Sequence, residues 1–183
     1  MNKVRVAFAI FQFSVLFIVF SNALMGKELQ ARKETFSPTN PPTFEKFAIS
    51  EAYKGKMAPL KLNSYPEARK YRTRLRENVK AGPNFAGHYA VIAIGCGTNC
   101  QNQWVVNVKS GKILGRFLTS NDAEYRLGSN LLILNPPTEE YKKIYKENPK
   151  TPLLPEKTVY MVWEKDKPKV IYEVDMEKLL KVQ

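Results

Sequence analysis

Residues 82–101, with the sequence GPNFAGHYAVIAIGCGTNCQ, constrain the fold of this chain more than any other stretch. They contain both cysteines, the only histidine and four of the nine glycines of the 183-residue chain. Before them the hydrophobic residues follow the spacing of a helix, and after them the pattern changes to strands joined by tight turns. Any chemistry that needs a thiol or an imidazole is also confined to this stretch.

A helix is predicted over residues 66–80, shortly before the glycine-rich stretch. Its apolar residues recur at the 3.6-residue spacing of an amphipathic helix, Pro66 suits the first turn, and Asn63 or Ser64 can cap it. A neighbouring face carries cations, which bind phosphates or a membrane surface in some proteins, and in others are solvated or paired within their own domain. The cationic residues are Arg69, Lys70, Arg72, Arg74, Arg76 and Lys80.

Strands are expected after the glycine-rich loop. Residues 88–96 are apolar on both faces, which is typical of a central strand buried on both sides. A short helix is expected over residues 139–147, with Thr138 as its N-cap and two glutamates in its first turn. Further strands are expected at residues 104–109, 112–117, 125–127, 131–134, 158–163 and 170–174.

Together these elements predict the α+β class. Strands joined by tight turns make a meander rather than alternating β-α-β units. We therefore expect a single curved antiparallel β-meander sheet, with the N-terminal amphipathic basic helix packed on it or across one end. The second helix is expected to be short.

The first 23 residues resemble a secretory signal peptide. Lys3 and Arg5 form a basic start, an apolar run follows, and Ser21-Asn22-Ala23 supplies small residues for cleavage after Ala23. The alternative is an uncleaved membrane anchor, but a spanning helix needs about 20 apolar residues and this run is shorter. The sequence therefore predicts a periplasmic or secreted protein, with no transmembrane span after the signal is removed.

The remaining chain of about 160 residues is expected to form one domain. Residues 24–45 contain several prolines and no sustained periodicity, which indicates a flexible spacer, so the domain is placed at residues 46–183. Phe44 and Phe47 mark the start of the folded part. Loss of the two basic signal residues lowers the formal charge from +12 to +10.

This basic excess favours anionic partners. For an exported protein, we expect an anionic envelope polymer or an acidic protein rather than nucleic acid. The alternative is that the basic surface serves solubility only.

Cys96 and Cys100 are expected to form a structural disulfide across a hairpin. Gly97 and Asn99 can both take positive φ, which a short hairpin loop needs, and such a loop brings the two Cα atoms within disulfide range. Exported proteins occupy compartments where disulfides persist. The loop is very small, so the chain-entropy model assigns the bridge only about 2 kcal/mol.

Three functional alternatives for the cysteines are weaker. Redox pairs usually have two intervening residues, and here there are three. A thiol nucleophile with His88 as its base needs the two groups to meet, but His88 and Cys96 are about 26 Å apart on one extended strand. A zinc site needs four ligands, and two thiolates with one imidazole supply three. No catalytic, cofactor-binding or metal-binding residue is therefore assigned.

The loop at residues 82–89 is a second candidate for function. Two glycines, a proline and an asparagine in eight residues indicate a loop of required shape, and such loops carry binding groups or only reverse the chain. The candidate binding face combines Asn84 and His88 of this loop with Arg72 and Arg76 of the helix and with the disulfide hairpin.

Residues 72–101, RTRLRENVKAGPNFAGHYAVIAIGCGTNCQ, resemble a core segment of a family of small uncharacterised secreted proteins of proteobacteria. The shared elements are the Arg-x-Arg-Leu-Arg helix, the Pro-Asn-Phe-Ala-Gly-His-Tyr loop and the Gly-Cys-Gly-Thr-x-Cys hairpin. One departure is Ile94, which stands where the family often has an aromatic residue. The resemblance implies a bacterial, exported protein and brings no activity, catalytic residue or ligand with it.

The leading functional hypothesis is a non-enzymatic binding module of the periplasm or cell surface. One alternative is a hydrolase or transferase that uses His88 with a carboxylate such as Asp122, Glu124 or Asp175, although no spacing marks these residues as a group. Another is a secreted effector that acts on a host or a competitor, which the basic charge permits.

Overall fold

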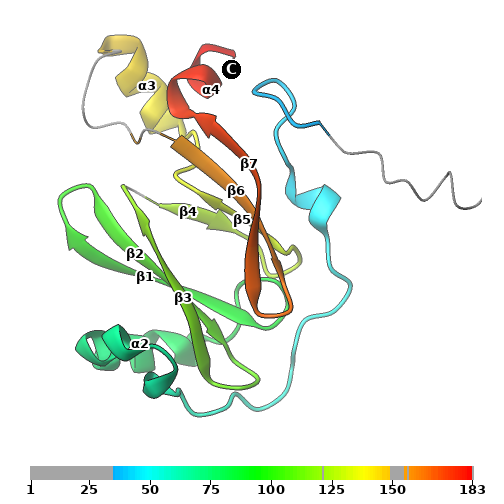
Figure 1. Ribbon diagram of the computed structural model, residues 1–183, viewed down its shortest axis with the longest axis vertical. Coiled ribbons are helices and arrows are strands. Elements are labelled where there is room, and N and C mark those ends of the chain that lie inside the picture. Colours follow the sequence, from blue (N-terminus) through cyan, green and yellow to red (C-terminus); the bar gives the residue numbers. More distant parts are fainter. Residues whose placement is uncertain (1–34, 121, 149–154, 156, 183) are drawn as a thin grey trace, which may run out of the picture. The chain divides into compact units, whose positions relative to one another are not determined.

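The computed structural model describes residues 35–120, 122–148, 155 and 157–182 (Figure 1). Residues Phe36–Gln183 form one compact unit. The predicted signal peptide at residues 1–23 lies outside the described residues. No helix within the described ranges is long and apolar enough to cross a bilayer.

The described strands form two antiparallel sheets, so the α+β class is confirmed but the single sheet was wrong. The first sheet has the order β1-β2-β3, and the second has the order β4-β5-β6-β7. The strands of the first sheet are β1 (Tyr89–Gly97), β2 (Cys100–Asn107) and β3 (Lys112–Thr119). Those of the second are β4 (Ala123–Tyr125), β5 (Leu131–Leu134), β6 (Lys157–Glu164) and β7 (Lys167–Asp175).

The predicted basic helix is built from three pieces rather than one amphipathic α-helix. Only its middle, α2 (Arg72–Asn78), is α-helical, between the 3₁₀-helices η3 (Pro66–Tyr71) and η4 (Val79–Ala81). Neither proposed cap is used, because the residue before η3 is Tyr65 and the Ser64 hydroxyl instead accepts a hydrogen bond from the Ile113 amide. The remaining described helices are η1 (Phe44–Phe47), η2 (Leu62–Ser64), α3 (Glu139–Glu147) and α4 (Met176–Val182).

The two sheets pack face to face over an inter-sheet core. In β1, Tyr89 and Val91 point into this core, where they meet Leu132 of β5 and Trp163 of β6. The intervening side chains of β1 point to the opposite face, because side chains alternate along a strand. β1 is therefore apolar on both faces for a different reason than predicted: it is an edge strand of its sheet, and separate layers cover its two faces.

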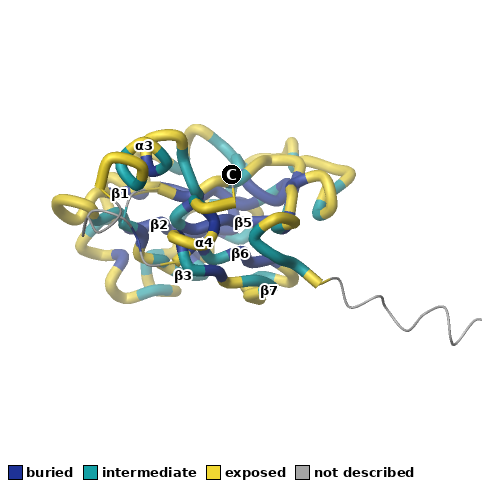
Figure 2. The backbone as a smooth tube through the Cα atoms, turned by 90° about the horizontal axis from the view of Figure 1, so that it is seen from above, coloured by how far each residue is buried: buried dark blue, intermediate teal, exposed yellow. Residues whose placement is uncertain are grey.

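Helices and loops cover the two outer faces. The helical segment η3–α2 buries Ala68 and Leu75 against Ile92 and Trp104 on the outer face of the first sheet. Figure 1 shows α2 below that sheet, and Figure 2 shows the strands as the most buried part of the chain. On the second sheet, η1 and α4 supply the outer layer, with their buried side chains packed around Val162. Each sheet thus has two buried faces, which accounts for the apolar runs in β1 and β5.

Part of the segment interpreted as a spacer belongs to the folded unit. Phe36 packs against Phe47 and Tyr172, and Phe44 is buried on the second sheet. The apolar side chains of residues 36–45 occur at irregular intervals and show no periodicity in the sequence. They nevertheless cover a sheet face, and we call this segment the N-terminal strap. Residues 36–45 are therefore part of the structure, and the domain begins before residue 46.

Two hairpins depend on positive backbone φ. Gly97 and Asn99 have φ values of 143° and 51°, as the sequence predicted for the disulfide hairpin. Lys165 and Asp166 have φ values of 50° and 64° in the turn between β6 and β7, where no glycine is present. Two consecutive positive φ values are the signature of the tight turn that suits the strand twist. The sequence showed only a polar connection there.

Candidate functional site

The cationic segment of residues 66–81 presents its charges to solvent. Arg72, Arg74 and Arg76 are exposed on α2, while Leu75 between them is buried. None of the six cations forms an ion pair with any carboxylate in the described part of the chain. Arg69 donates to the Asn63 side chain at 2.7 Å, and Arg72 donates to the carbonyl oxygen of Arg69 in η3. This face therefore keeps its positive charge available for an external anion.

Asn84 holds the loop onto β1. Its side-chain nitrogen donates to the carbonyl oxygen of Val91 at 2.9 Å, and its side-chain oxygen accepts from the Val91 amide at 2.8 Å. The next residue, Phe85, exchanges backbone hydrogen bonds with Tyr89 and is fully buried. The Asn84 side chain thus pairs with the edge of β1 as a neighbouring strand would. Both its nitrogen and its oxygen are already hydrogen-bonded to Val91.

His88 lies directly before β1 and is partly buried. Its ring packs against that of Tyr89, tilted by 35°, with the centroids 4.1 Å apart. Burial lowers the pKa of His88, the nearby Lys109 lowers it further, and Asp166 acts in the opposite direction. The imidazole therefore sits beside one cation and one carboxylate, and its neutral form is favoured.

A polar contact that the sequence did not predict lies beside His88. The Asp166 carboxylate accepts hydrogen bonds from the Tyr89 hydroxyl at 2.9 Å and from the Asn107 side chain at 2.8 Å. Burial and this carboxylate raise the pKa of Tyr89 to about 12. Asp166 is 77 residues from Tyr89 in the chain, so no local pattern links them. The contact ties the tip of the β6–β7 hairpin to the first sheet.

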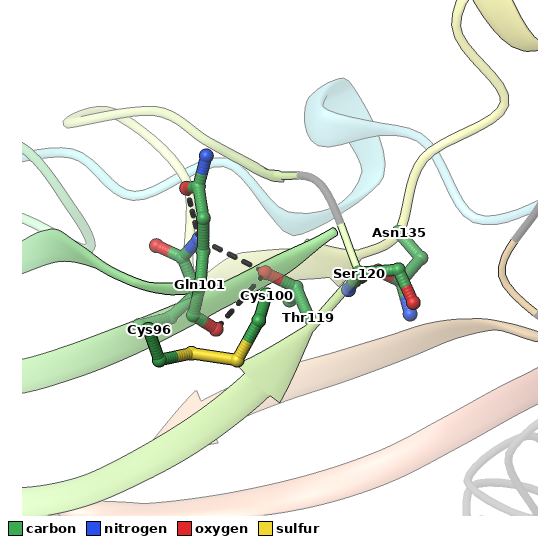
Figure 3. Close-up of a disulfide and its surroundings, with 7 residues drawn as sticks. Cys96, Cys100, Gln101, Thr119, Ser120 and Asn135 are labelled. Atoms are coloured by element: carbon green, nitrogen blue, oxygen red, sulfur yellow. Dashed lines mark hydrogen bonds between the residues drawn. A yellow bond between two sulfur atoms is a disulfide. The ribbon is translucent and has the colours of Figure 1, made fainter. Parts of the chain in front are cut away.

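The Cys96–Cys100 disulfide is confirmed, with Cα atoms 5.1 Å apart. The pairing between β1 and β2 shifts between Gly95 and Gly97, which makes Cys96 the extra residue of a β-bulge. Figure 3 shows the bridge close to Thr119, whose hydroxyl donates to the Gln101 carbonyl. The bridge therefore fixes an exposed hairpin tip, whose base is held by polar contacts to β3.

The structure divides the predicted binding residues between two ends of one strand. His88 precedes β1 and Cys96 is near its end, so the strand length separates them by about 26 Å. Arg72 and Arg76 lie on α2, which packs against β1, and they are exposed. The histidine loop and the hairpin therefore do not form one compact face.

The carboxylates considered for an enzyme lie elsewhere. None of Asp122, Glu124 and Asp175 is among the groups that shift the pKa of His88. A polar hollow of about 330 Å³ lies beside Asp175 and Lys178, between β7 and the N-terminal strap, and His88 does not line it. In the described ranges, no group of three or more histidine, cysteine or acidic side chains could hold a metal ion.

No protein-family model, curated protein or solved structure matches the chain.

Proposed function

We propose that this protein is an exported, non-enzymatic binding module that captures an anionic partner through the cationic face of η3, α2 and η4. One observation carries the proposal: six cations lie within twelve residues, and no described carboxylate pairs with any of them. The partner is an anionic component of the cell envelope or an acidic protein. The Cys96–Cys100 disulfide supports export, because such bridges persist in oxidising compartments.

The absence of carboxylate partners matters because a cation that is paired within its own domain is less available to an external anion. Elsewhere in the described part of the chain, cations do form ion pairs, such as Lys178 with Asp175 at 2.9 Å and Lys181 with Glu177 at 2.6 Å. The cationic face instead concentrates like charges on a short helical segment, which attracts anions over roughly a Debye length, about 10 Å at 0.1 M salt. Its self-repulsion is relieved when an anionic partner binds.

The test compares two double charge reversals. Arg72→Glu with Arg76→Glu changes the cationic face, and Lys143→Glu with Lys146→Glu makes the same change in net charge on α3. Binding to poly-L-glutamate and to vesicles containing phosphatidylglycerol is measured at about 0.1 M and about 1 M salt, where the Debye length falls from about 10 Å to about 3 Å. We expect the arginine variant alone to lose about tenfold or more in affinity at low salt, which is about 1.4 kcal/mol.

Equal losses in the two variants would show that overall charge drives binding, and would contradict a specific face. No loss in either variant would contradict the proposal altogether. The two probes separate a lipid surface from an acidic polypeptide. Circular dichroism of each variant confirms that the exposed substitutions leave the fold intact.

A further inference from the structure

β1 is the least protected edge strand of the described structure. The sheets have four edge strands, β1, β3, β4 and β7. Natural sheets protect such edges with charges, proline or very short strands. β3 and β7 carry lysines, β7 also contains Pro168, and β4 has three residues. β1 has nine residues and no charge or proline.

The backbone groups of β1 point alternately toward β2 and away from it. The Val108 amide donates to the carbonyl of His88, so His88 and every second residue after it face β2. The residues between them face outward, as the bond from the Asn84 side chain to Val91 shows. By this alternation Ala93 and Gly95 also face outward.

Only the first half of this outer edge is occupied. Phe85 pairs with Tyr89, and Asn84 pairs with Val91. No hydrogen bond from the described part of the chain reaches the outward amides and carbonyls of Ala93 and Gly95. Both residues are exposed, so solvent reaches this part of the strand. An incoming strand therefore has room and unsatisfied backbone partners.

The open edge also has a defined shape. The disulfide closes the hairpin directly beyond Gly95, and the bulge at Cys96 ends the regular pairing. A constrained hairpin loses less conformational freedom when a partner strand pairs with it, and this reduces the cost of binding.

Positive charge accompanies this edge. α2 packs against β1, and η4 leads straight into the loop that pairs with the edge. Lys80 is four residues before Asn84, so its Cα atom lies within about 14 Å of the residue that covers the edge at Val91, directly before the free part. A partner strand laid along Ala93 and Gly95 therefore approaches the cationic face.

We propose that the outer edge of β1 at Ala93 and Gly95 binds an extended acidic peptide segment, which adds a strand to the first sheet. Backbone hydrogen bonds to Ala93 and Gly95 supply the pairing, and acidic side chains of the peptide face the cations of α2 and η4. This inference rests on the proposed function and names the partner class as an acidic polypeptide.

A second copy of this chain fits the edge less well. Antiparallel pairing of two β1 strands places two cationic segments at one interface, in a chain with a formal charge of +12. Like charges brought together across an interface cost several kcal/mol. An acidic segment replaces this repulsion with attraction.

The test uses an eight-residue peptide of alternating glutamate and valine. A second version carries an N-methyl group on every backbone amide, which keeps its side-chain charge but removes all amide donors for strand pairing. We expect the first peptide to slow amide hydrogen exchange at Ala93 and Gly95 by at least about tenfold, and the N-methylated peptide to bind at least about tenfold more weakly.

The protein variant is Ala93→Pro, which removes an outward amide that β2 does not use, so the first sheet keeps its pairing. Val170→Pro, on the edge strand β7, is the matched control. We expect only Ala93→Pro to weaken binding of the peptide.

Strand addition and the proposed function would be overturned by different results. Unchanged exchange at Ala93 and Gly95 under saturating peptide would overturn strand addition, even if the Arg72 and Arg76 reversals still abolish binding. If the variants with Arg72 and Arg76 reversed kept both peptide binding and the protection of the Ala93 and Gly95 amides, the proposed function would be overturned instead. A dimer in sedimentation that Ala93→Pro dissociates would replace the acidic peptide with a second copy.

Discussion

The two halves of β1 differ in how their outer edge is protected. From Tyr89 to Val91, every outward backbone group is paired by the preceding loop, and the side chains are buried. From Ala93 to Gly97 the edge faces solvent, and four of the five residues are exposed. One strand thus combines an anchored half, which belongs to the core, with an open half that a disulfide keeps in shape.

The difference shows that two conspicuous motifs of the sequence have unrelated roles. The Pro83–Tyr89 loop has a structural role, because Asn84 covers the edge of β1 and Phe85 fills the inter-sheet core. The cysteine hairpin stabilises an edge that nothing described in the chain covers. Binding residues should therefore be sought near the hairpin and α2 rather than in the loop.

Phe85→Ala provides the strongest test of the anchored half. Phe85 is fully buried against Tyr89, Tyr125 and Trp163, with ring centroids 6.1 to 6.3 Å apart. Truncation leaves a cavity between the sheets, and we expect the free energy of unfolding to fall by about 3–5 kcal/mol in urea denaturation.

The matched change in the open half is Thr98→Ala at the exposed hairpin tip. It should alter the free energy of unfolding by less than about 0.5 kcal/mol. A similar loss at both positions would show that the two halves are equally integrated into the core.

Asn84→Ala should convert the anchored edge into an open one. Val91 is buried, so both of its backbone groups lose a partner, and each unsatisfied group costs about 1–3 kcal/mol. We expect a loss of about 3 kcal/mol in unfolding free energy and faster amide hydrogen exchange at Val91. The exposed Asn78→Ala on α2 is the control, since its side chain only donates to an exposed helix carbonyl. Unchanged exchange at Val91 would mean that another group protects this edge.

The sequence predicted local structure better than tertiary structure. Helix α3 has the predicted bounds of 139–147, and Thr138 caps it by accepting a hydrogen bond from the Tyr141 amide. Gly97 and Asn99 have the predicted positive φ. These features depend on neighbouring residues, which is the information that a local pattern contains.

The sheet arrangement and the contacts around the histidine could not be predicted in the same way. An apolar run such as β1 shows that both faces are buried, but not whether strands, helices or straps cover them. Asp166 appears in the sequence only as a polar turn residue, and its contacts with Tyr89 and Asn107 exist because the two sheets stack. The available signal for this turn was the polar connection that contains Lys165 and Asp166 between two strand-like segments.

Replacing both Cys96 and Cys100 by serine addresses the open half. The small loop gives a chain-entropy contribution of about 2 kcal/mol, so the free energy of unfolding should fall by about that amount. Because the bridge constrains the hairpin rather than the core, amide exchange should accelerate mainly from Ala93 to Gln101. Chemical reduction of the wild-type protein should reproduce the effect and leave the double variant unchanged. Faster exchange throughout the first sheet would show that the hairpin supports the core after all.

The smallest expected effect is a pH dependence at His88, beside the anchored half. Folding lowers the pKa of this imidazole from 6.5, through burial and the charge of Lys109, so the unfolded chain binds the proton more readily. Stability should therefore be highest at neutral and higher pH and should fall as the pH drops below about 6.5, toward the lower folded pKa. Because this is the only histidine in the chain, His88→Gln should flatten the urea-denaturation profile in that window, and Lys109→Ala should make it shallower. An unchanged slope in the glutamine variant would assign the dependence to another group.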